Sequence, residues 1–126
     1  MRAIKKNEII IALVFDTELE EGTHPLTDEK FALQIVALKH PAGKILPAHY
    51  HKPADRHTKQ LVEGLFVISG KVRVSVYHQK EQVESVDLSA GQGVMIVDGG
   101  MGIEVLEDAQ MYEFKNGPFI EDKELI

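Results

Sequence analysis

The sequence contains no cysteine and no long run of apolar residues. The lack of cysteine excludes disulfides, thiolate metal ligands and cysteine nucleophiles. The longest apolar run, Ile9–Phe15, is far shorter than the roughly 20 residues that a membrane-spanning helix requires. The first residues, Met1–Glu8, have neither the apolar stretch nor the small-residue cleavage site of a signal peptide. We therefore expect a cytoplasmic protein with no membrane partner.

Basic residues are also in short supply. The chain has 14 Lys and Arg against 20 Asp and Glu, which gives a net charge of −6 and a pI near 5.5. A nucleic-acid-binding surface requires a basic patch, so this balance argues against a nucleic-acid partner. With 126 residues, 44% of them hydrophobic, the chain is long enough for one domain with its own core. We expect a single domain over residues 1–126.

The hydrophobic pattern indicates strands and almost no helix. Short runs rich in Val, Ile and Phe are separated by Gly, Pro, Asp or Asn, and Val72, Val74 and Val76 alternate with polar residues. Ser69–Lys71 and Asp98–Gly100 are typical of tight hairpins. Nine short strands in one domain predict a sandwich or barrel. The predicted strands are Glu8–Phe15, Phe31–Lys39, Lys44–His51, Val62–Ser69, Lys71–His78, Val83–Asp87, Gly93–Val97, Met101–Glu107 and Gln110–Lys115; Asp16–Lys30 is predicted to be a surface loop.

Two histidines stand one residue apart at the end of one predicted strand. Side chains at positions i and i+2 of a strand point to the same face, so His49 and His51 are expected to project side by side. Two neutral imidazoles together with a carboxylate are a common ligand set for a divalent transition metal. The sequence therefore predicts a metal or small-molecule pocket at this strand.

These residues resemble a known family. The pattern Gly43-x5-His49-x-His51, followed by Glu63-x6-Gly70, resembles the first motif of the cupin superfamily, and 91–100 resembles the second. The chain is also similar to small uncharacterised cupins found with polysaccharide-biosynthesis proteins. The resemblance implies an all-β double-stranded β-helix (a jelly roll, the cupin barrel) with its core at about 31–119. It further implies a homodimer and a small-molecule pocket in the barrel mouth.

Carried over position by position, the family's metal ligands are His49, His51 and Glu63. The metal is then a divalent transition ion such as zinc, iron, manganese or nickel. This chain departs from the family in having eleven residues between His51 and Glu63, which leaves Asp55 as a rival carboxylate. The insertion is tolerable because the cost of closing a loop grows only slowly with its length.

A second departure concerns the last histidine of the family's metal site. At the corresponding place the chain has Met101 and Gly102, and methionine is a poor ligand for iron, manganese or zinc. His57 or His78 could supply a substitute ligand. The alternatives are therefore a site with three protein ligands and water, or no metal.

Three functions are compatible with these residues. The first is a metal-dependent enzyme on a small oxygenated or sugar-derived substrate. The second is a metal-free sugar-nucleotide isomerase or epimerase, with His49 or His51 as general base and Tyr112, or else Tyr77, as the acid. In that case Arg56, Lys59 and Arg73 are the basic residues available for a diphosphate. The third is a non-catalytic ligand-binding module, which the missing histidine favours.

Overall fold

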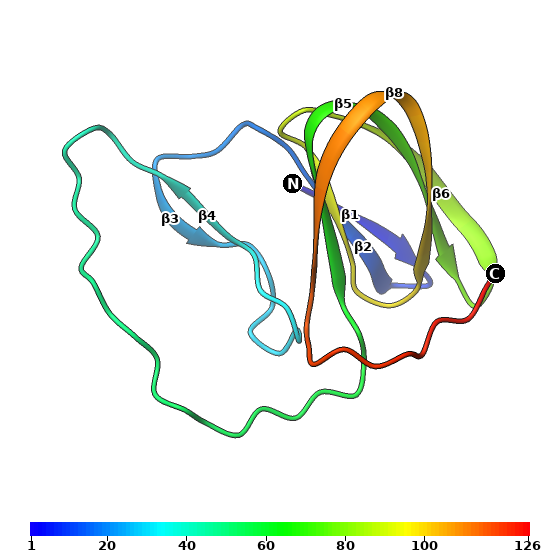
Figure 1. Ribbon diagram of the computed structural model, residues 1–126, viewed down its shortest axis with the longest axis horizontal. Coiled ribbons are helices and arrows are strands. Elements are labelled where there is room, and N and C mark those ends of the chain that lie inside the picture. Colours follow the sequence, from blue (N-terminus) through cyan, green and yellow to red (C-terminus); the bar gives the residue numbers. More distant parts are fainter.

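The computed structural model describes residues 1–126 and contains strands but no helix (Figure 1). The all-β prediction is therefore confirmed. No helix is present that has the length and apolar character needed to cross a membrane. The strands are β1 (Arg2–Lys6), β2 (Ile9–Phe15), β3 (Gly22–Pro25), β4 (Val36–Lys39), β5 (Glu63–His78), β6 (Glu81–Ser89), β7 (Gly93–Ile96) and β8 (Gly100–Lys115).

Six strands form one antiparallel sheet, and β3 and β4 form a separate pair. The order in the large sheet is β1-β2-β7-β5-β6, with β8 on the other edge of β5. The first part of β5, Glu63–Phe66, pairs with β7, and its last part, Lys71–His78, pairs with β6. β8 pairs with β5 over nearly its whole length, so these two long strands connect both parts of the sheet.

The sheet folds over itself where β5 bends at Gly70. This glycine has a φ of +82°, and a Cβ atom there would overlap the backbone carbonyl of Asp108 on β8. The register between β5 and β8 shifts on both sides of the bend, as at a β-bulge. In Figure 1 the two strands curve over together at the top of the molecule. The predicted hairpin at Ser69–Lys71 is therefore wrong: the glycine marks a corner within one strand.

The main core lies between the two layers that this bend creates. Leu65 and Val67 precede the bend, Val72 and Val74 follow it, and all four are at most 1% exposed. Burying an aliphatic side chain of this size stabilises the fold by about 1.5–3 kcal/mol, so the layers are held chiefly by apolar contact. The other members of the cluster are Ile4, Ile11, Ala12, Val76, Leu88, Val94 and Ile96. We call the sheet surface that faces this core the inner face.

A smaller cluster covers the outer face near β2 and β7. Leu13, Val62 and Met95 are buried there, and residues from the connection between β3 and β4 pack against them. These residues include Phe31 and Leu33, which lie in a predicted strand that forms only at Val36–Lys39. The rest of that predicted strand is an irregular segment that contributes side chains instead of backbone pairing.

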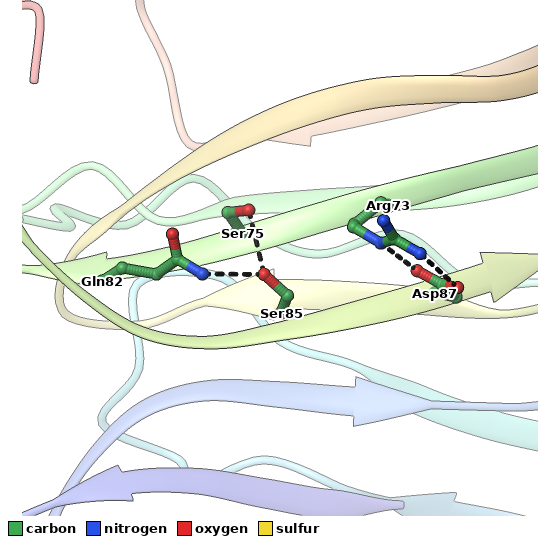
Figure 2. A network of polar contacts seen from close by, with 5 residues as sticks. All are labelled: Arg73, Ser75, Gln82, Ser85 and Asp87. Atoms are coloured by element: carbon green, nitrogen blue, oxygen red, sulfur yellow. Dashed lines mark hydrogen bonds and ion pairs between the residues drawn. The ribbon is translucent and has the colours of Figure 1, made fainter.

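The outer face of the other layer is polar. Nε and Nη2 of Arg73 donate to the two carboxylate oxygens of Asp87 at 2.7 and 3.1 Å (Figure 2). Further along the same two strands, the Ser75 and Ser85 hydroxyls lie 3.1 Å apart, and Gln82 donates to Ser85. The alternation predicted for β5 is thus confirmed, with valines inside and polar side chains outside.

The two sides of the folded sheet are closed differently. On one side β1 and β6 are joined by ion pairs, from Arg2 to Glu84 at 2.7 Å and from Lys6 to Glu81 at 2.9 Å. On the other side β8 pairs only with β5, so its second edge has no partner strand. The chain therefore presents one long unpaired edge.

Several predicted elements differ from the structure. The strands predicted at Glu8–Phe15 and Gly93–Val97 are confirmed within a residue, whereas β1 and β3 were not predicted. The predicted strand Lys44–His51 is absent, because these residues find no partner strand and lie in an irregular segment from 40 to 62. In Figure 1 this segment sweeps away from the folded sheet.

Replacing Gly70 with alanine tests the bend. We expect Gly70→Ala to lower the free energy of unfolding by ~2–4 kcal/mol, because the methyl group meets a positive φ and the Asp108 carbonyl. The control is Gly43→Ala, at φ +89° with open space around it, which we expect to cost no more than ~1 kcal/mol. Equal losses for the two variants in urea unfolding would contradict this role of Gly70.

Candidate functional site

The carboxylate chosen from the sequence, Glu63, begins β5 and faces inward. It is the cross-strand partner of Ile96 on β7 and of Lys115 on β8, and cross-strand partners share a face of the sheet. Its side chain is 23% exposed. Nζ of Lys115 lies 3.7 Å from Oε2 of Glu63 and 3.6 Å from Oε2 of Glu113. Two carboxylates and one ammonium group therefore meet at this end of the sheet.

The surroundings of Glu63 disfavour its charged form. Partial burial is the main cause that raises the pKa of Glu63, and the neighbouring Glu113 carboxylate raises it further. Lys115 acts in the opposite direction but does not compensate fully. Glu63 is thus a carboxyl group that gains stability from a proton or from an additional nearby cation.

Both ends of β5 come together at the turn between β7 and β8. Oδ1 of Asp98 accepts a hydrogen bond from Nε2 of Gln60 at 3.2 Å, just before β5. Oδ2 of the same residue lies 3.8 Å from Nε2 of His78, at the end of β5. The His78 ring is mostly buried, and its Nδ1 has no hydrogen-bond partner. We call this region, from Glu63 to the Asp98 turn, the open end of the folded sheet.

Asn116 fixes the approach of the chain to the open end. Its Oδ1 accepts a hydrogen bond from the backbone N–H of Val62 at 2.7 Å. Its Nδ2 donates to the hydroxyl of Thr58 and to the carbonyl of Gln60, both at 3.1 Å. The sequence carries no motif for this contact, because it joins residues more than fifty positions apart.

The predicted histidine pair lies away from Glu63. His49 and His51 are exposed in the segment from 40 to 62, with ring centroids 5.3 Å apart and the rings nearly perpendicular. His49 Nδ1 is 3.0 Å from the carbonyl oxygen of Pro47, within the same segment. The structure thus brings the two imidazoles together, but does not bring the carboxylate to them. No group of three histidine, aspartate or glutamate side chains is arranged to hold a metal.

The other candidate residues are spread over the molecule. Tyr112 pairs with Phe66, on the outer face, and is 64% exposed beside Phe114. Met101 pairs with Val76 and packs against the main core on the inner face at the open end. The rest are distributed as follows: Asp55, Arg56, His57 and Lys59 are exposed in the 40–62 segment, Tyr77 faces outward opposite Gly100, and Arg73 is bound to Asp87.

Two surface hollows lie elsewhere. One, of about 340 Å³, lies between the N-terminal strands and β6 and includes Arg2, Asp16 and Asp87. The other, of about 210 Å³, is formed by the β5–β6 turn and the C-terminal residues, among them Lys80 and Glu124. Neither of these two hollows contains Glu63 or the histidine pair.

A scan against protein-family models, a search of curated proteins and a search of solved structures returned no match to this chain.

The raised pKa of Glu63 predicts a pH-dependent effect of Glu63→Gln. The pKa of Glu63 is higher in the folded state than in the unfolded chain, where a glutamate has its usual pKa of 4.5. The folded state therefore binds this proton more tightly. The stability that proton binding by Glu63 contributes is therefore fully present at pH values below the unfolded-state pKa. It is lost as the pH rises through the folded-state pKa. In the metal-free monomer we expect Glu63→Gln to be more stable than the parent protein at pH 7, with the difference disappearing by about pH 4.

Urea unfolding of both proteins at several pH values measures this difference. The matched control is Glu104→Gln, which removes an exposed carboxylate on the outer face of β8. If the effects of the two substitutions depend on pH in the same way, then Glu63 has no special environment.

Proposed function

We propose that the chain is a small-molecule-binding protein of cupin-like jelly-roll fold, with its ligand site at the open end. In this proposal His49, His51 and Glu63 hold a divalent transition metal once the histidine segment lies against the sheet. The observation that carries the proposal is the position of Glu63. It is a half-buried inner-face carboxylate with incomplete charge compensation, at the residue that the sequence motif selects.

The topology supports the jelly-roll part of the proposal. A jelly roll packs two antiparallel sheets face to face, and here a single sheet folds over so that β5 and β8 each serve both layers. The unpaired edge of β8 has room for a further strand. Residues 44–51 have the composition of a strand and have no partner.

The length of the connecting segment permits the histidines to reach Glu63. Eleven residues separate His51 from Glu63. An extended chain of that length spans on the order of 35–40 Å, which exceeds the width of a small domain. Only the residues after 57 are tied down near Asn116, so docking requires no change in the folded sheet.

The donor set decides which metals are suitable. Imidazole and carboxylate groups bind zinc, iron, manganese and nickel, and the chain has no thiolate that would favour softer ions. As the residues stand, the ligands are not assembled, so we assign no reaction step to a metal. A cation beside Glu63 would offset the cost of ionising this carboxylate.

The metal-free alternative gains no support from the arrangement. Tyr112, the proposed acid, is on the outer face, whereas Glu63 is on the inner face. Arg73, proposed for a diphosphate, is bound to Asp87 on the outer face of the other layer. A small oxygenated or sugar-derived ligand at the open end therefore remains our proposal for the substrate class.

Metal analysis of the purified protein tests this proposal. We expect near-stoichiometric zinc, iron, manganese or nickel in the parent protein, and little in His49→Ala/His51→Ala or in Glu63→Gln, because each variant loses part of the ligand set. The matched control is His24→Ala/His40→Ala, which removes two other histidines and should keep the metal. A parent protein that stays empty after each of these metals is offered would overturn the proposal.

A further inference from the structure

The last residues of the chain, 116–126, cross the open end of the folded sheet, and we call them the tail. They leave β8 after Lys115, which pairs with Glu63 in one layer, and they end beside the β5–β6 turn in the other layer. In Figure 1 the tail is the red segment that runs along the lower end of the sheet and ends close to β6. The tail therefore lies across the way into the site proposed above.

The tail is fixed firmly at its start. Asn116 forms three hydrogen bonds at 2.7 to 3.1 Å, with the backbone N–H of Val62, the hydroxyl of Thr58 and the carbonyl of Gln60. The next residue, Gly117, has no atom of another segment within 4 Å of the place where a Cβ would lie. Because glycine also has the widest choice of backbone conformation, rotation at Gly117 can move the rest of the tail while Asn116 stays in place.

The far end of the tail is held weakly. Nζ of Lys80, in the β5–β6 turn, lies 2.8 Å from Oε1 of Glu124, and the two side chains are 63% and 78% exposed. The side chain of Ile126 rests over the α-carbon of Gly100, in space that a Cβ atom would occupy. No other hydrogen bond or ion pair joins residues 117–126 to the rest of the chain. Exposed ion pairs contribute little and are screened by salt, so this contact is easily broken.

Release of the tail uncovers little apolar surface. Phe119, Ile120 and Leu125 are 87%, 67% and 84% exposed while the tail is in place. Because the free energy of apolar burial scales with the area removed from water, these side chains do little to hold the tail. A hollow of about 210 Å³ also remains between the tip of the tail and the two turns. A firm start and a weak, polar far end are the properties of a hinged lid, which has to open at low cost.

We propose that the tail is a gate over the open end, closed by the ion pair between Lys80 and Glu124 and opened by rotation at Gly117. With the ion pair formed, the tail restricts entry from solvent to the inner face, where Met101 and Glu63 lie. With the ion pair broken, the tail moves away and entry is free. The gate stands on the contacts of the tail alone, whereas its control over a bound metal rests on the function proposed above.

Thiol accessibility tests the gate without reference to metal. The chain has no cysteine, so Met101→Cys carries a single thiol, on the inner face at the open end. Its reaction rate with a bulky pyrene maleimide is divided by its rate with N-ethylmaleimide, because this ratio cancels any change in the ionisation of the thiol. We expect Glu124→Gln to raise the ratio about 1.5- to 5-fold, the effect of losing an exposed ion pair. Removal of residues 119–126 should raise it at least as much.

Two controls and a charge exchange make this experiment specific. Glu121→Gln removes an exposed carboxylate of the tail that forms no ion pair, and should leave the ratio unchanged. A thiol on the outer face of β8, in Glu104→Cys, should not respond to any change in the tail. Lys80→Glu/Glu124→Lys, which restores the ion pair with its charges exchanged, should return the Met101→Cys ratio to that of the parent tail. An unchanged ratio after removal of the tail overturns the gate, and an exchanged pair that fails to restore the ratio overturns the role of the ion pair.

The rate of metal release connects the gate to the proposed site. In a parent protein that holds zinc, we expect Glu124→Gln to release it to excess EDTA about 1.5- to 5-fold faster, with the amount of bound zinc unchanged, because the ligand residues are intact. Glu121→Gln, which removes the same charge, should release zinc at the parental rate. Equal release rates for all three proteins overturn control of the metal by the gate. A metal-free parent whose tail still protects the thiol overturns the metal proposal and leaves the gate intact.

Discussion

The bend of β5 at Gly70 is the constraint on which the rest of the structure depends. It folds one antiparallel sheet into two layers, so that Leu65 and Val67 face the valines that follow the bend. It also returns the end of β5 to its beginning, where Asp98 contacts His78 at the end of the strand and Gln60 just before its start. A straight strand of this length would leave one apolar face uncovered and would keep Glu63 far from the turn. The bend thus creates the core and the open end together.

The two sides of the folded sheet differ in how far they are completed. The ion pairs between β1 and β6 are exposed and add little to stability, whereas the apolar side chain of Ile4 is buried on that side. On the other side, the second edge of β8 has no partner strand. Because free backbone groups on an edge strand bind other strands readily, natural proteins usually block such edges. The edge of β8 has no strand or helix over it, but four acidic residues and the shift of register near Gly70 are features of this kind.

The sequence predicted correctly the strands that show a local alternation of apolar and polar residues. It failed where pairing between residues far apart in the chain decides the structure. The alternation at Val72, Val74 and Val76 was sufficient to predict one buried face. Gly70 was misassigned because a glycine between two strand-like runs is equally compatible with a hairpin and with a bent strand, and only pairing with β8 distinguishes them. The motif singled out Glu63, which lies at the open end. Glu113 and Lys115 could not be predicted, because they meet Glu63 only through the register of β5 with β8.

The ionisation of Glu63 and the docking of the histidine segment are linked. In the isolated chain, burial and the neighbouring Glu113 raise the pKa of Glu63, so its charged form, which a metal ion requires, is disfavoured. A basic segment with two imidazoles, placed beside this carboxylate as proposed, favours its charged form. By reciprocity, the charged form then favours docking to the same extent. Ionisation of Glu63 and docking of the histidine segment therefore favour each other, and both are favoured when a cation binds beside the carboxylate.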